Sequence, residues 1–493
     1  MHSLSNRRNF FLILTTVSIM AACSVVYLGL KQSVWFDEAY SIDIAKQSWG
    51  EIVRLTAEDV HPPLYYWLLK FWMLLFGDNE LALRSMSALF FGASLVTMGA
   101  LLRKFFGAKT ALFALAFILA APFLLRYGFE IRMYSLASCI GVLATYVLVT
   151  AVDTKQERRR RLLMGLYALL VVAGMYTLYF MALIWITHLV WLCIKSREKG
   201  KYLLIEGVVA YGVSLLLFLP WLPSVLAGLA GGTLSPVTHA LNFDNLVGIV
   251  TYMFLYQPPW RFSPGYVAII VVTLLLIGLI VWSGYTYATA RQRRAMFLFA
   301  LYFLVPIAVL FVVTQFKPIY LERYIAHFAI GGYALIGVCA AITLQKADWL
   351  RRDAAVLLLL VFLSGCVSLA QYGNYNFQRL HTPSIKQVSA LLDSCKSGAV
   401  VFADGPQIAV ELGYYVRECP IYFFNETLEM TGGFAMISNS PYRVASSKEL
   451  PDSDEVLHVY YNTPKNVLPD IYERTAIVTA DKVTVETYRR GGV

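Results

Sequence analysis

The chain has 493 residues, of which 58% are hydrophobic and only 15% are charged. A soluble domain is about half apolar and about a quarter charged, so this composition excludes an ordinary soluble protein and indicates an integral membrane protein. The net charge of +10 does not indicate nucleic-acid binding, because the basic residues fall in short clusters between apolar runs, as the positive-inside rule requires.

Apolar runs of membrane-spanning length recur along the first three quarters of the chain. The first run is too long for the core of a signal peptide and lacks a clear small-residue cleavage site, so we predict a retained helix there. In total the sequence predicts about eleven spanning helices, at residues 10–30, 81–102, 110–127, 133–152, 162–178, 180–195, 203–222, 266–288, 296–314, 325–344 and 354–372.

Basic clusters occupy every second loop between these segments. They are Arg7/Arg8, Arg103/Lys104/Lys109, Lys155 with Arg158 to Arg161, Lys195/Arg197/Lys199/Lys201, Arg291/Arg293/Arg294 and Arg351/Arg352. Since loops rich in Lys and Arg stay on the inner side of the membrane, the alternation places the N-terminus inside. With an odd number of spans, the C-terminus is then expected outside.

The first outer loop, residues 31–80, has a different character. It begins with the run WFDEAYS from Trp35, continues through an amphipathic stretch, and reaches the run HPPLYYW from His61. Residues 64–76 are apolar but short for a span, and Lys70 interrupts them. We therefore expect an interfacial helix on the outer surface. The alternative, a further crossing, would break the alternation of basic loops.

From about Gln378 the sequence becomes polar and mixed. The sequence predicts strands at residues 400–402, 421–424 and 458–461 and a helix at residues 408–416. This alternation predicts a small α/β domain outside the membrane. We place the domains at 1–377 and 378–493. Cys395 and Cys419 lie in this region and can form a disulfide if it is extracytoplasmic.

The acidic pair Asp37 and Glu38 follows the first apolar segment directly. Carboxylates beside a membrane are costly to desolvate, which favours a functional role. The alternative is a solvated helix start, because acidic residues favour the first turn of a helix. In an enzyme, Asp37 at the outer face can accept a proton from an incoming hydroxyl or amine.

If the donor of such an enzyme is a sugar linked to a lipid phosphate, the departing phosphate needs cationic or hydrogen-bonding partners. The same predicted face offers several such residues. Arg132 and Arg323 can instead snorkel to lipid headgroups, and His61 can simply begin an interfacial helix before two prolines. The candidate substrate-binding residues are His61, Glu130, Arg132, Tyr134, Lys317, Arg323 and Tyr324.

The sequence resembles the C-type membrane glycosyltransferases in four features. These are the acidic pair after the first helix, the amphipathic loop, the run HPPLYYW and the following ELALRSMSAL. The nearest group is the bacterial branch of the protein O-mannosyltransferases and lipid A aminoarabinose transferases. Residues 30–150 carry the resemblance, which extends to Arg323 and Tyr324. It implies a multi-pass enzyme of the plasma (inner) membrane. Such an enzyme transfers a sugar from a polyprenyl phosphate to a lipid, glycan or protein of the envelope, with inversion at the anomeric carbon.

The resemblance also implies roles for single residues. Asp37 matches the base that activates the acceptor, and Glu38 matches the neighbour that orients acceptor or base. His61 stands where some relatives carry a phosphate-binding lysine, and a neutral imidazole can still donate one hydrogen bond. Arg323 and Tyr324 match the donor-phosphate region.

The next site is matched more loosely. Arg132 and Tyr134 lie near a polar site where relatives carry an acid, of which Glu130 is the nearest here. One acidic pair makes a poor metal cage, so we expect no cofactor, although a divalent metal is an alternative.

Two other functional classes remain open. A transporter or flippase of lipid-linked saccharides is the main alternative, but transporters usually contain internal repeats and charges at the membrane midplane. No repeat is evident, and the notable polar residues lie near one face. A non-catalytic envelope scaffold is the third, and it predicts that substitutions in the first loop are harmless.

Overall fold

The computed structural model describes residues 7–59, 61–230, 240–256, 264–372, 384–392, 398–417, 419–425, 436–437, 440–480 and 482–491. It divides into two compact units. The first unit comprises Met1–Val26, Arg84–Leu226 and Leu234–Leu369. The second comprises Tyr27–Leu83, Ala227–Thr233 and Ala370–Val493, so the first loop and the C-terminal region belong to one unit.

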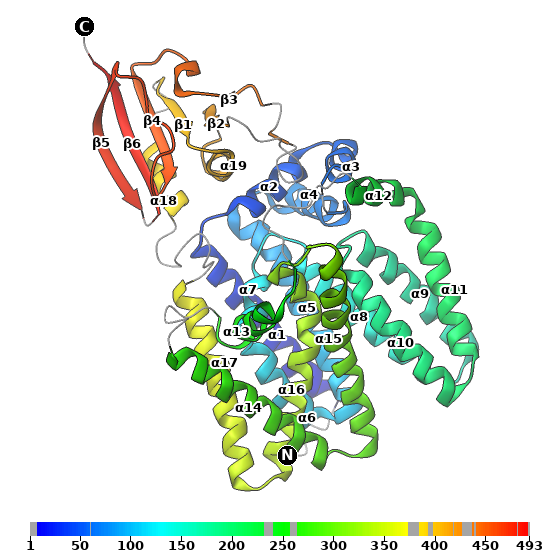
Figure 1. Ribbon diagram of the computed structural model, residues 1–493. Helices are drawn as coiled ribbons and strands as arrows, with labels where there is room; N and C mark the ends of the chain where they lie inside the picture. The colour runs from blue at the N-terminus through cyan, green and yellow to red at the C-terminus, as the bar shows by residue number, and fades with distance from the viewer. Residues whose placement is uncertain are drawn as a thin grey trace. The chain divides into compact units, whose positions relative to one another are not determined.

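The first unit consists of helices, which Figure 1 labels. They are α1 (Arg7–Leu30), α5 (Glu80–Phe106), α6 (Ala108–Leu119), α7 (Pro122–Gly128), α8 (Tyr134–Asp153), α9 (Glu157–Met175), α10 (Met181–Lys199), α11 (Tyr202–Phe218), α12 (Leu222–Ala230), α13 (Phe243–Phe254), α14 (Pro264–Tyr287), α15 (Ala290–Phe316), α16 (Ala326–Lys346) and α17 (Trp349–Tyr372), with 3-10 turns η2 (Leu219–Trp221) and η3 (Glu322–Ile325).

Within the described residues, eight helices are long and apolar enough to cross a membrane. A ninth is added if α6 and α7, which are bent by 73° at their junction, form one span. All eleven predicted spans fold as helices or as this bent pair. The two others are α9 and α10, whose basic ends shorten their apolar stretches, so eleven spans stays a prediction.

Helix α16 is the centre of the first unit. In the span that contains it, 94% of the residues in the most apolar stretch are buried, and α16 contacts α6, α8, α14 and α15. Its contact with α14 is close because α14 carries a glycine there. A Cβ added to Gly284 would overlap the Cα and Cβ of Cys339 on α16. Small residues allow two helix backbones this approach.

We therefore expect Gly284→Ala to destabilise the helical bundle by roughly 1–3 kcal/mol, the usual range for overpacking. Gly278→Ala is the matched control, because it lies in the same helix and a Cβ there meets nothing within 4 Å. Thermal unfolding of the two variants in the same detergent measures the difference. Equal midpoints would show that α14 and α16 can move apart freely.

In the second unit, the first loop forms three short helices: α2 (Phe36–Lys46), α3 (Trp49–Ala57) and α4 (Leu64–Phe76). Helix α4 has 13 residues, whereas a membrane-spanning helix needs about 20. This length agrees with the predicted interfacial helix. Its position in a membrane stays a prediction.

The C-terminal region is an α/β domain, as predicted. Its elements are α18 (Ser384–Ser389), β1 (Val400–Ala403), α19 (Pro406–Tyr415), β2 (Ile421–Phe424), β3 (Arg443–Val444), the 3-10 turn η5 (Ser447–Glu449), β4 (Glu455–Tyr461), β5 (Tyr472–Ala480) and β6 (Val483–Arg490). The sheet order is β3-β2-β1-β4-β6-β5. Strands β3, β2, β1 and β4 are parallel, and β6 and β5 are antiparallel to their neighbours.

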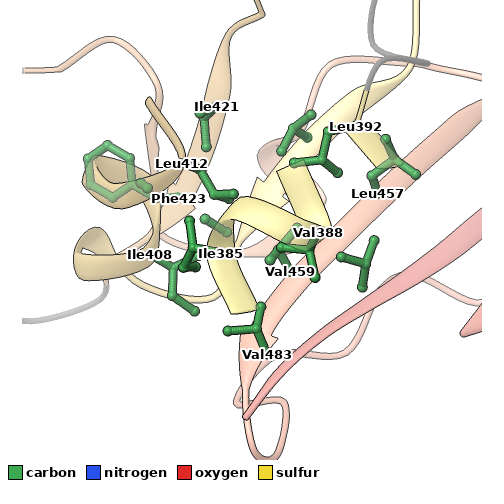
Figure 2. Close-up of a cluster of buried hydrophobic side chains, with 14 residues drawn as sticks. Ile385, Val388, Leu392, Ile408, Leu412, Ile421, Phe423, Leu457, Val459 and Val483 are labelled. Carbon is green, nitrogen blue, oxygen red and sulfur yellow. The ribbon is translucent and has the colours of Figure 1, made fainter. Parts of the chain in front are cut away.

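One face of this sheet is covered by α18 and α19. Figure 2 shows side chains from both helices meeting those of β2, β4 and β6, with Val388, Leu412 and Val459 in the buried cluster. The core thus fixes the position of α19 on the sheet. Cys419 is in a disulfide. Its predicted partner Cys395 and the boundary predicted at 377–378 lie outside the described residues.

Candidate active site

Helix α2 carries the acidic pair on its first turn. Its N-cap residue is Trp35, in extended conformation, and Trp35 has no side-chain oxygen with which to cap the helix. The buried carboxylate of Glu38 turns back and accepts a hydrogen bond from the Trp35 backbone N–H at 3.3 Å. Glu38 therefore stabilises the helix start, but as a buried side chain and not as the solvated one that the alternative interpretation expected.

Asp37 is placed differently from its neighbour. It is half-buried, and its backbone carbonyl accepts a hydrogen bond from the Ser41 hydroxyl at 2.7 Å. The backbone of the residue is thus held by the first turn of α2. The carboxylate on this fixed turn is the candidate base.

His61 is buried in the middle of the same loop, just before the two prolines that lead into α4. Its Nδ1 lies 3.7 Å from an Asp59 carboxylate oxygen, and Asp59 is buried as well. A helix start alone does not explain two buried ionisable groups side by side. Sequence reasoning missed Asp59, which is the last residue of the amphipathic stretch predicted at residues 42–59.

In the first unit, the structure brings together five of the predicted residues. The Tyr134 side chain interacts electrostatically with Arg323, Arg132, Glu130 and Tyr324. Tyr134 is the first residue of α8, while Arg323 and Tyr324 lie in the 3-10 turn before α16. Residues almost two hundred positions apart in sequence therefore form one polar cluster.

The loop between α7 and α8 builds one side of this cluster. The Glu130 carbonyl accepts hydrogen bonds from the Arg132 N–H at 2.7 Å and from the Ser87 hydroxyl at 2.6 Å. The Glu130 carboxylate pairs with Arg126 at 3.3 Å, and the guanidinium of Arg84 donates to the Phe129 carbonyl at 3.2 Å. These contacts hold a loop whose arginine and glutamate side chains are all buried.

Arg323 and Tyr324 build the other side. The Tyr324 ring stacks on Phe180 with a centroid separation of 4.3 Å, and the Arg323 guanidinium lies 6.0 Å from the Tyr324 ring centre. The Phe180 carbonyl is also 3.1 Å from the Nε2 atom of His327, on the first turn of α16. These contacts fix the turn that carries Arg323.

Lys317 is placed at the end of α15. It is the C-cap residue, in extended conformation, and its backbone N–H donates to the Val313 carbonyl at 3.0 Å. The structure gives it a position in the connection that leads to Arg323. Its proposed contact with substrate stays a prediction.

Sequence reasoning missed Arg84 and Arg126. Arg84 is among the largest fully buried side chains, and Arg126 is 6% exposed. The signal was present, because both interrupt apolar runs and ionisable residues in such runs are functional candidates by default. We counted them instead as parts of spans 81–102 and 110–127.

Residues 60–223 match the family model described as dolichyl-phosphate-mannose-protein mannosyltransferase. The matched range includes HPPLYYW and the loop from Phe129 to Tyr134, but not Asp37 or Arg323. No curated protein sequence is similar enough to this chain to count as a match.

Solved structures resemble nearly the whole chain. ArnT from Cupriavidus metallidurans bound to undecaprenyl phosphate has a TM-score of 0.61 and 14% identity, over 98% of this chain and 98% of that chain. Its apo state gives a TM-score of 0.59 and 14% identity, over 96% and 97%. The oligosaccharyltransferase AglB from Archaeoglobus fulgidus, in complex with an inhibitory peptide and a dolichol-phosphate, gives 0.51 and 12% over 81% of this chain and 63% of that chain.

At these identities the structural matches show a shared fold. The family match adds sequence similarity over the segment that contains HPPLYYW and the loop from Phe129 to Tyr134. This chain is thus a multi-pass membrane protein that shares the fold of ArnT and, over residues 60–223, is similar in sequence to the mannosyltransferase family model. These findings confirm its predicted resemblance to glycosyltransferases that use a lipid-phosphate-linked sugar.

Proposed function

We propose that this protein transfers a sugar from a polyprenyl phosphate to a lipid, glycan or protein of the cell envelope, with inversion and with Asp37 as the base. The reaction is assigned to the outer face of the plasma (inner) membrane. The proposal is supported by the family match, by the fold shared with a protein solved bound to undecaprenyl phosphate, and by the chemistry of the two units.

The observation that carries the proposal is the arginine cluster of the first unit. Arg84, Arg126, Arg132 and Arg323 gather around the loop and the turn that also hold Glu130 and Tyr134. Arginine is suited to phosphate because its planar fork donates two parallel hydrogen bonds. A lipid phosphate is an anion of the kind that guanidinium groups bind in this way.

Asp37 supplies the other half of the chemistry. In the proposed step, the acceptor oxygen or nitrogen forms a bond to the anomeric carbon while the bond from that carbon to the phosphate oxygen breaks. The proton of the acceptor passes to Asp37, and the electron pair leaves with the polyprenyl phosphate. A single displacement of this kind inverts the anomeric carbon.

The leaving group explains why so few catalytic groups are needed. A phosphate departs readily when its charge is met, so the protein mainly positions the reactants and stabilises that charge. Arg323 is assigned to the donor phosphate, with Tyr324 and Tyr134 beside it. His61 is assigned a hydrogen bond to substrate, and Glu38 orients Asp37 through the helix start.

The experiment that tests the function compares envelope lipids, glycans and proteins from cells with and without the chain by mass spectrometry. We expect the mass of one sugar to be missing from one class of acceptor when the chain is absent. Accumulation of a lipid-linked saccharide on the inner face, with no acceptor altered, would identify a flippase instead.

A further inference from the structure

Helix α19 of the C-terminal domain lies against α2 (Figure 1). A carboxylate oxygen of Glu411 accepts a hydrogen bond from the Phe36 backbone N–H at 2.9 Å, and the Tyr415 hydroxyl accepts one from the Val34 N–H at 2.8 Å. Both donors lie at the start of the helix that carries Asp37. Glu411 is only 1% exposed.

A helix start leaves backbone N–H groups without partners inside the helix. Serine, threonine, aspartate or asparagine at the N-cap usually accepts one of these hydrogen bonds, but here the N-cap is Trp35. Glu411 supplies an acceptor from 375 residues further along the chain. The start of α2 is therefore completed by a different domain.

The same domain also holds the far end of the first loop. The Tyr415 hydroxyl lies 3.1 Å from a Glu80 carboxylate oxygen, which also receives the Lys386 ammonium at 2.9 Å. Arg417 pairs with Asp78 at 2.7 Å. Loop 31–80 is thus attached to the C-terminal domain at both of its ends.

The second carboxylate oxygen of Glu411 is hydrogen-bonded to the Tyr461 hydroxyl of β4. The charged groups that act on Glu411 are Asp37 and Glu38 of α2, both acidic. Burial raises the pKa of Glu411 to about 8, and the negative charges of the two acids add to this increase. The hydrogen bonds with Tyr461 and Phe36 act in the opposite direction and lower the pKa. At neutral pH the side chain is mostly protonated, so it caps α2 without adding a third negative charge.

We propose that Glu411 is a positioning residue of the transfer reaction, which seats the first turn of α2 and thereby sets the place of the Asp37 carboxylate. The inference rests on the proposed role of Asp37. It assigns the C-terminal domain a part in catalysis that sequence analysis did not give it. Glu411 acts through the backbone of Phe36 and does not contact the substrate.

We expect the protonation of Glu411 to set an alkaline limit for the reaction. Because the pKa of Glu411 is raised by folding, the folded protein binds more protons than the unfolded chain between the ordinary glutamate pKa and about 8. The contribution of Glu411 to the free energy of unfolding therefore falls as the pH rises through this range. Above it, the ionised carboxylate repels Asp37 and Glu38, and we expect α2 to be held less firmly.

The test uses the full-length protein in one detergent with three variants. Glu411→Gln keeps both hydrogen bonds but cannot ionise, whereas Glu411→Ala removes the cap. Glu486→Gln is the matched control, since Glu486 is a buried acid of the same domain that bonds to Tyr488 and Arg474 on the sheet. Hydrogen exchange of residues 34–46, kcat and the pH profile of transfer are measured for each.

We expect faster exchange over residues 34–46 in Glu411→Ala alone, and a fall in kcat of ~10- to 100-fold, as for a catalytic group displaced by about 1 Å. Glu411→Gln should restore kcat at neutral pH and retain activity above the pH at which the wild type declines. Glu486→Gln should match the wild type in all three measurements.

Two outcomes would overturn the inference: unchanged exchange over residues 34–46 in Glu411→Ala, or the same alkaline decline in Glu411→Gln as in the wild type. Hydrogen exchange requires no turnover, so the seating of α2 is tested even if no sugar transfer occurs. Failure of the proposed function is a separate result, seen as the absence of transfer in the wild type.

Discussion

Asp37→Asn is expected to abolish transfer while the protein still folds and inserts. Asparagine keeps the shape of the side chain and its place on the first turn of α2, but its amide cannot accept the acceptor's proton. Loss of a general base lowers rates by ~10²–10⁴-fold. The measurement is transfer by purified protein with a polyprenyl-phosphate-linked sugar, together with thermal unfolding to show that the variant is intact.

Asp43→Asn is the matched control for this variant. Asp43 is a half-buried acid further along the same helix, and its carboxylate pairs with Lys46 at 3.3 Å. The same chemical change at this position should leave transfer close to wild type. If Asp37→Asn retained activity, or if both variants lost it equally, Asp37 would not be the base.

Arg323→Ala should lower kcat by about 10²–10³-fold, the usual effect of removing a group that stabilises charge in the transition state. It should also raise KM for the lipid-linked donor, because the phosphate carries charge before the reaction as well as during it. Arg323→Lys should recover part of the loss, since lysine keeps the charge but not the planar fork.

Arg351→Ala controls for the loss of an arginine stacked on aromatic rings. Its guanidinium lies 4.8 Å from the Trp282 ring centre and donates to the Tyr287 hydroxyl at 3.0 Å, in the same unit. We expect unchanged kcat and KM for this variant. Equal defects in the two variants would assign Arg323 to the stability of the helical unit rather than to the donor phosphate.

The helices could be predicted from the sequence because a long apolar segment in a membrane must hydrogen-bond its own backbone groups, and an α-helix does so. What the runs did not predict is where one of them breaks. No charged residue occurs between Thr110 and Leu125, yet the structure bends by 73° between α6 and α7. Pro122 begins α7, and a proline lacks the N–H that a continuing helix requires.

Three strands of the C-terminal sheet, β1, β2 and β4, were predicted, whereas β3, β5 and β6 were not. Strands β1, β2 and β4 are short apolar runs, which are easily recognised. Strand β5 lies at the edge of the sheet, and nearly all of its residues are exposed, so its sequence lacks the alternation of buried and exposed residues that marks a strand.

Within the candidate site, residues of unusual type were predicted and their partners were not. The acidic pair and HPPLYYW are recognisable by their composition, whereas Glu411 lies in an amphipathic helix where a glutamate usually faces water. Its burial depends on packing against α2, far away in sequence. Asp59 was missed for the same reason, because only its contact with His61 distinguishes it from a solvated residue.

The most direct test of the account measures the release of polyprenyl phosphate. The purified protein is incubated with a polyprenyl-phosphate-linked sugar and a membrane extract as the source of acceptor, and the lipid products are followed by mass spectrometry. The account predicts that free polyprenyl phosphate and a glycosylated acceptor appear together with wild-type protein and that neither appears with Asp37→Asn. Movement of the intact lipid-linked sugar across a bilayer without release of polyprenyl phosphate would contradict it.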